Sequence, residues 1–248
     1  SNIVLLPNVV FIILLLIIVT AGPLHASADT SSSWIDSAES RYSAAATQYD
    51  MEALRNLADV ITLKPVDEQK KPRALLLHGC VLWRLQLIAF CKNSEKDILR
   101  YGKVSVKKLK EAETAGADMY LTASYKAFAY QLMAGQGINN GAINGPLAAK
   151  ELKKAQKANP KGYYTLLVEA INANQAPSFA GGSPQKAIVL FEKMISAFPD
   201  SVDVKIHLAE AYGKAGRKED ARQLIAPVVK EYPSNLLAWT IADRLAAP

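Results

Sequence analysis

The sequence predicts an all-α protein, a right-handed solenoid of stacked antiparallel helix pairs that ends in a C-terminal capping helix. Apolar residues recur at helical spacing, and no long stretch shows the period of two that is typical of a β-strand. A four-position pattern also recurs: Ala, an apolar residue four positions later, another three further on, and Pro five beyond that. Half of the 248 residues are hydrophobic, which is ample for a core that grows by stacking.

The pattern occurs four times. The copies are Ala53, Leu57, Val60 and Pro65; Ala148, Leu152, Ala155 and Pro160; Ala187, Phe191, Met194 and Pro199; and Ala221, Ile225, Val228 and Pro233. The alternative is an ordinary helical bundle that uses Pro as a helix stop, and four copies in register favour the repeat. A single helix pair of this length cannot bury its apolar face, so the copies must stack on one another.

The stretch 202–235 shows how one unit is built. Leu208, Ala209 and Tyr212 share one side of a first helix, Gly216 marks the turn, and Pro233 ends the second helix. This order of residues resembles the tetratricopeptide repeat, a helix–turn–helix unit of about 34 residues. The resemblance implies the stacked architecture and assigns no cellular role by itself.

The remaining helices follow from periodicity and from capping residues. Helices are expected at 34–49, 50–64, 72–91, 93–115, 117–134, 146–158, 161–174, 184–197 and 235–246, the last as a solvating cap. Asp50, Ser94 and Ser183 are the expected N-caps. The very apolar segment 72–91 contains Arg84 and Gln86, so it is expected to be a buried central helix rather than a membrane span.

Two glycine-rich segments interrupt the expected helices. Segment 135–146 holds four glycines and three asparagines, which predicts an irregular loop with Pro146 opening the next helix. Segment 174–184 predicts a second loop at the same edge of the solenoid. Either loop could bind a partner, and the alternative is an insertion tolerated at a surface turn.

In the second loop, Pro177, Phe179, Gly181 and Gly182 form a pattern that resembles a loop of exported bacterial tetratricopeptide-type proteins. These include proteins similar to the T-component accessories of periplasmic solute transporters. The resemblance covers this loop and its flanking helices. It implies a small-ligand-binding accessory of such a transporter as one possible role.

Residues 1–28 differ from the rest of the chain. Residues 9–19 form an unbroken apolar run, and Ala26-Ser27-Ala28 resembles a signal-peptidase site. We therefore expect a signal peptide or an N-terminal membrane anchor at 1–28 and a helical repeat domain at 29–248. The predicted location is the periplasm or another exported compartment, and tethering to the inner membrane by residues 1–28 is the alternative.

The composition argues against an enzyme, a metal site or a cofactor. No nucleophile motif or phosphate-binding loop is present, and the histidines lack neighbours at metal-ligand spacing. The net charge of +6 is concentrated in 92–113 and 150–161. Such segments could steer an acidic partner or form a solvated helix face, and no aromatic interleaving supports nucleic-acid binding.

We therefore expect a non-catalytic scaffold that binds a protein or peptide on its concave face and edge loops. The alternatives are a small-ligand-binding accessory of a solute transporter and a membrane-tethered assembly factor, whose partner would be a membrane-associated complex. The candidate binding residues are aromatic residues of the concave face, residues of the second loop, and basic residues. They are Tyr125, Tyr164, Phe179, Gly181, Gly182, Lys150 and Lys154.

Overall fold

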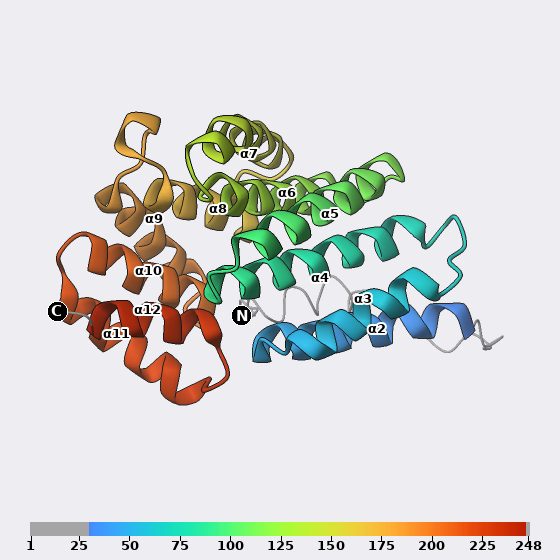
Figure 1. Ribbon diagram of the computed structural model, residues 1–248, viewed down its shortest axis with the longest axis horizontal. Coiled ribbons are helices and arrows are strands. Elements are labelled where there is room, and N and C mark those ends of the chain that lie inside the picture. The colour runs from blue at the N-terminus through green and yellow to red at the C-terminus, as the bar shows by residue number, and fades with distance from the viewer. Residues whose placement is uncertain (1–29, 247–248) are drawn as a thin grey trace, which may run out of the picture.

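Figure 1 shows the computed structural model of the chain, which describes residues 30–246. Residues 1–29 and 247–248 lie outside this part, and the predicted leader with them. The described residues form eleven α-helices and one short 3-10 turn, without strands. The helices are α2 (Thr30–Gln48), α3 (Met51–Leu63), α4 (Lys71–Cys91), α5 (Glu95–Thr114), α6 (Met119–Ala134), α7 (Ile138–Ala158), α8 (Tyr163–Gln175), α9 (Pro184–Ala197), α10 (Val202–Lys214), α11 (Lys218–Glu231) and α12 (Leu236–Ala246), and the 3-10 turn is η1 (Ser178–Ala180).

The helices stack in pairs. Each even-numbered helix from α2 to α10 packs on the odd-numbered helix that follows it, and α2, α4, α6, α8, α10 and α12 contact one another in turn. The stack describes an arc in Figure 1, from α2 and α3 at the lower right, over α6 and α7, to α10, α11 and α12 at the lower left. The prediction of an all-α solenoid of stacked helix pairs is confirmed.

The recurring pattern marks the buried positions of most odd-numbered helices. Ala187 and Phe191 are fully buried in α9, and Ala221 and Ile225 are buried at the matching positions of α11. In the first copy, two of the buried positions lie one residue after those that the pattern selected. The residues that α3 buries are Leu54, Leu57, Ala58 and Ile61. Ala53 and Val60, which the pattern selected, are only partly buried.

Helix α4 is the central core helix. Among residues 30–246 it is the one helix long and apolar enough to cross a membrane, and most of that stretch is buried inside the protein. Gly79 lets α5 approach closely, since an added Cβ would lie 2.5 Å from the Leu109 side chain. The Ser105 hydroxyl of α5 donates to the Gly79 carbonyl over 2.8 Å. The expectation of a buried central helix is confirmed.

All three expected N-cap residues stand at that position. The backbone N–H of Ala53 donates to the Asp50 carboxylate, and that of Lys186 donates to the Ser183 hydroxyl. Ser94 makes no such capping hydrogen bond, because its hydroxyl donates to the Asp97 carboxylate instead.

The prediction of an irregular loop at 135–146 was wrong. Helix α7 begins at Ile138 and contains Pro146. The side chain of Asn140 donates to the carbonyl of Gln136, and that of Asn144 donates to the carbonyl of Asn140. Extensive packing of α7 on α6 adds to these hydrogen bonds and outweighs the low helix propensity of the segment. The loop at 174–184 is present in shorter form, between Gln175 and Pro184, with η1 inside it.

The two ends of the arc meet. Helix α12 contacts α4 as well as α10 and α11. The Ser234 hydroxyl, just before α12, donates to the Gln48 side chain at the end of α2. The guanidinium of Arg244 lies 5.8 Å from the centre of the Phe90 ring. The solenoid therefore bends far enough for α12 to touch α4 and for the residue Ser234 before it to touch the end of α2.

Candidate functional site

Closely packed aromatic rings of α4, α6 and α8, in edge-on and tilted pairs, lie where a concave binding surface was expected. Tyr125 is 2% exposed, and its ring centre lies 5.1 Å from Trp83 and 5.2 Å from Tyr164. Burial raises the pKa of Tyr125 well above its ordinary value. The guanidinium of Arg84 lies 5.0 Å from the centre of the Trp83 ring. Tyr125 is thus a core residue, and Tyr164 is half-buried beside it.

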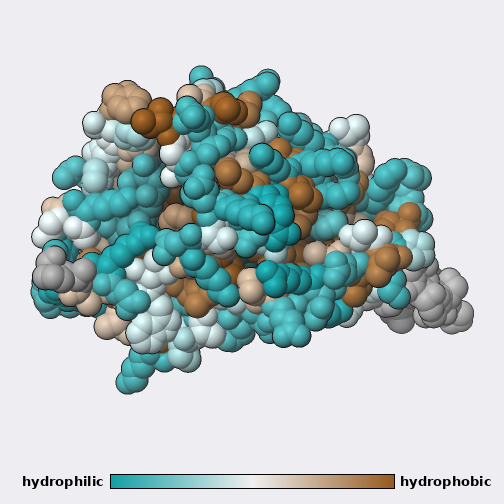
Figure 2. Space-filling view, viewed as in Figure 1, coloured by the Kyte–Doolittle hydropathy of each residue, from teal (hydrophilic) through white to brown (hydrophobic). Residues whose placement is uncertain are grey.

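The second loop places Phe179 at the surface, 92% exposed. Ile138 and Ile143 of α7 are exposed as well. Figure 2 shows apolar side chains along the upper rim of the molecule, over α7 and the α8–α9 loop. The two glycines of this loop serve its geometry. Gly181 has φ of +85°, and a Cβ at Gly182 would lie 1.7 Å from the carbonyl oxygen of Ala176.

The two candidate lysines of α7 differ in their surroundings. Lys150 is exposed, and no ion pair joins it to any residue of 30–246. Lys154 lies 3.3 Å from the carboxylates of both Glu113 and Glu151. These two carboxylates also pair with the fully buried Lys126 of α6, with 2.9 Å between Lys126 and Glu151. Lys154 therefore belongs to a structural cluster that ties α5, α6 and α7 together.

The seven predicted residues lie in the core, on the upper rim and on α7, so the structure does not bring them together in one site. Within the part of the chain that the structure describes, no group of His, Cys, Asp and Glu could hold a metal ion.

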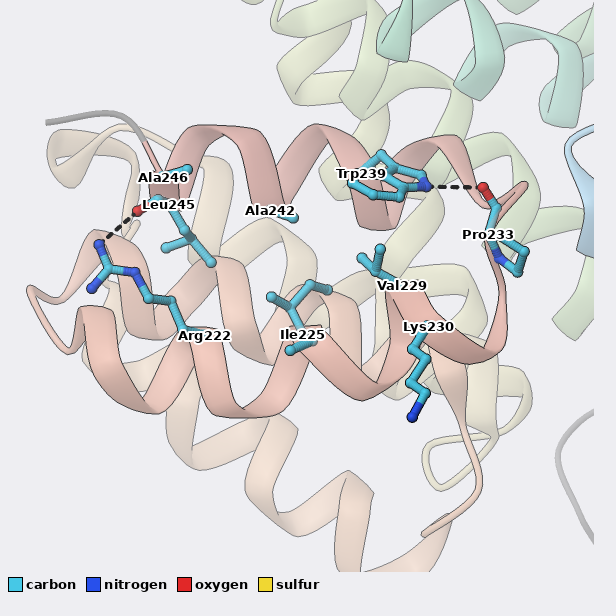
Figure 3. Close-up of a pocket in the computed structure, with 10 residues that line it drawn as sticks. Arg222, Ile225, Val229, Lys230, Pro233, Trp239, Ala242, Leu245 and Ala246 are labelled. Carbon is cyan, nitrogen blue, oxygen red and sulfur yellow. Dashed lines mark hydrogen bonds between the residues drawn. The ribbon is translucent and has the colours of Figure 1, made fainter.

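An open apolar groove lies between α11 and α12 at the C-terminal end of the described chain. Its volume is about 500 Å³. Figure 3 shows the side chains of Ile225, Val229 and Leu245 directed into it, with Trp239 and Pro233 at one end. The lining residues are Arg222, Ile225, Ala226, Val229, Lys230, Pro233, Trp239, Ala242, Leu245 and Ala246.

Trp239 gives this groove an aromatic wall. The side chain is 44% exposed, and its indole N–H donates to the carbonyl of Pro233 over 2.9 Å. The hydrogen bond leaves the ring free to contact an apolar partner without an unsatisfied polar group. An exposed tryptophan on an apolar floor is typical of a protein-binding surface.

The same surface exists one repeat earlier. A second groove, of about 430 Å³, is lined by Glu192 and Ile195 of α9 and by Leu208 and Tyr212 of α10. The residues 34 positions after these four line the first groove without exception. They are Ala226, Val229, Ala242 and Ala246.

The two surfaces differ in what packs on them. In the earlier repeat, Asp220, Gln223 and Leu224 of α11 also line the groove, because α11 packs beside α10 as the next helix of the stack. At the later position, no helix of residues 30–246 takes that place. Among the described residues, the α11–α12 groove therefore lacks a counterpart of the wall that α11 provides in the earlier groove.

The sequence-based reasoning missed this groove. Segment 235–246 was expected to be a solvating cap, yet Trp239 and Ala242 give the outer side of α12 an apolar face. The signal was present in the repeat register, because a cap should carry polar residues 34 positions after Leu208 and Tyr212. The chain carries Ala242 and Ala246 there.

Comparisons with known proteins agree with this architecture. Residues 178–245 match the family model for the tetratricopeptide repeat. No curated protein matches the chain significantly. Two solved structures share the fold over most of their lengths.

The HusA haemophore from Porphyromonas gingivalis has a TM-score of 0.55 and 17% identity, covering 84% of this chain and 96% of its own. A thermophilic tetratricopeptide repeat protein of Thermus thermophilus has a TM-score of 0.54 and 16% identity, covering 88% of this chain and 100% of its own. At such identities these likenesses concern the fold alone. The family match itself covers residues 178–245, and the two likenesses support the same stacked-helix fold for the rest of the described chain.

Proposed function

We propose that this protein is a non-catalytic scaffold that binds a helical segment of a protein partner in the α11–α12 groove. The observation that carries this proposal is the 34-residue equivalence of the two grooves, since a helix, α11, forms one wall of the earlier groove. Tetratricopeptide repeats generally mediate protein–protein interaction, in agreement with this role. Laying an amphipathic helix into an apolar groove is also a common mode of peptide recognition.

The groove fits this role better than the concave face or the edge loop that the sequence suggested. Tyr125 has no exposed surface to offer, and Tyr164 is covered in part by neighbouring rings. Phe179 is exposed on a three-residue turn and lines neither of the two grooves. By contrast, the groove combines an apolar floor with an aromatic wall along two rigid helices.

Binding of a small ligand, as the name of the haemophore indicates for that protein, is the alternative. A drug-sized ligand is usually enclosed over most of its surface. The α11–α12 groove is open along its length, and neither Tyr164 nor Phe179 lines it. These features favour a helix over a small molecule as its occupant.

A photo-crosslinking experiment tests this function. A benzoylphenylalanine introduced at Ala242, in the groove, is expected to crosslink to a helical segment of one partner protein in living cells. The same group at Val189, which is 50% exposed on α9 outside the groove, serves as the control. Crosslinks from Val189 but not from Ala242 would refute the proposed site.

A binding measurement with the identified partner completes the test. Val229→Glu places a charge on the apolar floor and should weaken binding by about 30-fold or more, the effect of losing a hot-spot residue. Phe179→Ser should leave the affinity unchanged. A larger loss of affinity in Phe179→Ser than in Val229→Glu would instead indicate that the partner binds at the edge loop.

We also propose that the scaffold acts after export. The apolar run at 9–19 and the Ala26-Ser27-Ala28 motif support this location. Mass spectrometry of the native protein should find a chain that starts at Asp29, and a retained leader would instead support membrane tethering.

A further inference from the structure

The charged residues that line the α11–α12 groove are all cations. Arg222 and Lys230 lie on α11, and no Asp or Glu lines the groove. Eight residues of helix separate the two, or about 12 Å along the axis. Both are exposed, at opposite ends of the apolar floor made by Ile225 and Val229.

The packing of the repeat does not require these cations. The residues 34 positions earlier are Ile188 and Ser196, which lie on α9. The groove that α11 lines thus lacks cations at these two positions, and the α11–α12 groove has them. The anion Glu192 of the earlier groove is also replaced, by Ala226, so the charges of the α11–α12 groove are only positive.

Both cations remain able to bind an external anion. No ion pair joins Lys230 to any residue of 30–246, and Figure 3 shows its side chain extending outward from α11, on the side away from α12. Arg222 donates through Nη2 to the Leu245 carbonyl over 3.1 Å, and its Nη1 lies 3.9 Å from the exposed Glu219 carboxylate. The Leu245 contact holds the guanidinium beside the groove, and the distant Glu219 leaves its charge largely uncompensated.

We infer that the occupant is an amphipathic helix of a protein partner with acidic side chains seven or eight positions apart along one edge. This inference rests on the proposed function and adds the chemistry of the partner. The apolar stripe of the helix would cover Ile225, Val229 and Trp239, and its acidic edge would meet Arg222 and Lys230. Charges at the rim of an interface mainly set specificity and association rate, so they select acidic helices from other amphipathic ones.

Two labelled peptides test this inference. Each carries the sequence 217–232 of this chain, which contains the helix that lines the equivalent groove one repeat earlier. The acidic peptide has glutamate at the positions of Asp220 and Pro227, and the basic peptide has lysine at both. Fluorescence anisotropy with the full chain should show at least about tenfold tighter binding of the acidic peptide at about 50 mM salt, with a smaller difference at about 500 mM.

Variants of the protein separate the two proposals. Reversal of both charges, Arg222→Glu with Lys230→Glu, should invert the preference for the two peptides. The matched control is Lys153→Glu with Lys157→Glu, which makes the same change of charge on α7 and should preserve the preference. Circular dichroism checks that each variant is folded.

Each remaining outcome has a defined meaning. Equal binding of both peptides, lost in Val229→Glu, would overturn the acidic-helix inference and keep the groove as a helix-binding site. Failure of both peptides to bind would count against both proposals. Self-association that Val229→Glu abolishes, measured by light scattering, would identify a second copy of the chain as the occupant and overturn the inference.

Discussion

Lys126 is the single charged residue of α6, and the structure buries it completely. Its ammonium pairs with Glu113 of α5 and Glu151 of α7, and Lys154 closes the cluster from the outside. Contact with Lys126 helps to lower the pKa of Glu113 against the opposing effect of burial. Two carboxylates of adjacent helices are thus neutralised by a lysine that solvent does not reach.

The Lys126→Met variant is expected to lose about 3–5 kcal/mol of unfolding free energy, because it leaves buried negative charge uncompensated. Lys154→Met is the matched control. That ammonium is partly exposed, so its loss should cost no more than about 1 kcal/mol. Urea denaturation measures the unfolding free energy of both variants. Equal losses would contradict the claim that the burial of Lys126 makes its charge more important to stability than that of Lys154.

The sequence contained a sign of this cluster, a lone lysine in an otherwise uncharged helix. It could not reveal which carboxylates pair with Lys126. Glu113 and Glu151 are distant in the chain and meet only after α5 and α7 pack on α6. Lys154 was predicted to bind a partner for the same reason, since its ion pairs depend on tertiary contacts.

The α8–α9 loop and α7 both contain glycines, but they use them differently. Gly182 has no room for a side chain, because an added Cβ would meet the Ala176 carbonyl. Gly145 lies in α7 with nothing within 4 Å of an added Cβ. The two positions form a natural pair for comparing local steric effects.

Gly182→Ala is expected to destabilise the protein by roughly 1–3 kcal/mol, because the backbone of the loop must move. Gly145→Ala should change the stability by less than about 1 kcal/mol, because the gain in helix propensity is opposed by contact of the new Cβ with the ring of the following Pro146. Thermal denaturation measures both changes. A loss in Gly145→Ala as large as that in Gly182→Ala would contradict the steric difference between the two positions.

At the scale of elements, sequence reasoning located most helices because their apolar periodicity and caps are local signals. It failed at α7, where side-chain hydrogen bonds from Asn140 and Asn144 and packing on α6 overrule local propensity. It also misjudged α12, whose length and place in the register suggested a cap. Only the comparison of Ala242 and Ala246 with their counterparts one repeat earlier shows that its outer face is apolar.

Glu210 connects three helices of the C-terminal half. Its carboxylate accepts hydrogen bonds from Gln175 at the end of α8, over 2.7 Å, and from Arg244 of α12, over 3.4 Å. Burial by itself would raise the pKa of Glu210, but contacts with His207, Lys214 and Gln175 outweigh it and lower the pKa to about 2. The charged form is therefore the form that the folded protein prefers.

This preference predicts acid sensitivity. Because the folded pKa lies below the unfolded value, Glu210 stabilises the fold fully above about pH 4.5, and its contribution is lost as the pH falls towards 2. Glu210→Gln should lower the stability at neutral pH and flatten its dependence between pH 4.5 and 2. Asp243→Asn, an exposed change on α12, should leave that dependence unaltered in urea titrations at several pH values.

The architecture of the whole molecule was predictable because a pattern repeated four times constrains stacking even when each copy is imperfect. The binding surface was not predictable to the same degree. The sequence suggested a concave face lined by tyrosines, and it could not show how far the arc bends. In the bent stack, Tyr125 packs against Trp83 and is buried, whereas the groove between α11 and α12 is open to solvent.

The meeting of α12 with α4, and of Ser234 with Gln48, has a mechanical consequence. Open repeat arrays stretch like springs, since each unit touches only its neighbours. In this protein, a contact between residues 186 positions apart joins the first and last units of the stack. This closure should resist stretching of the solenoid and keep the surface beside it rigid.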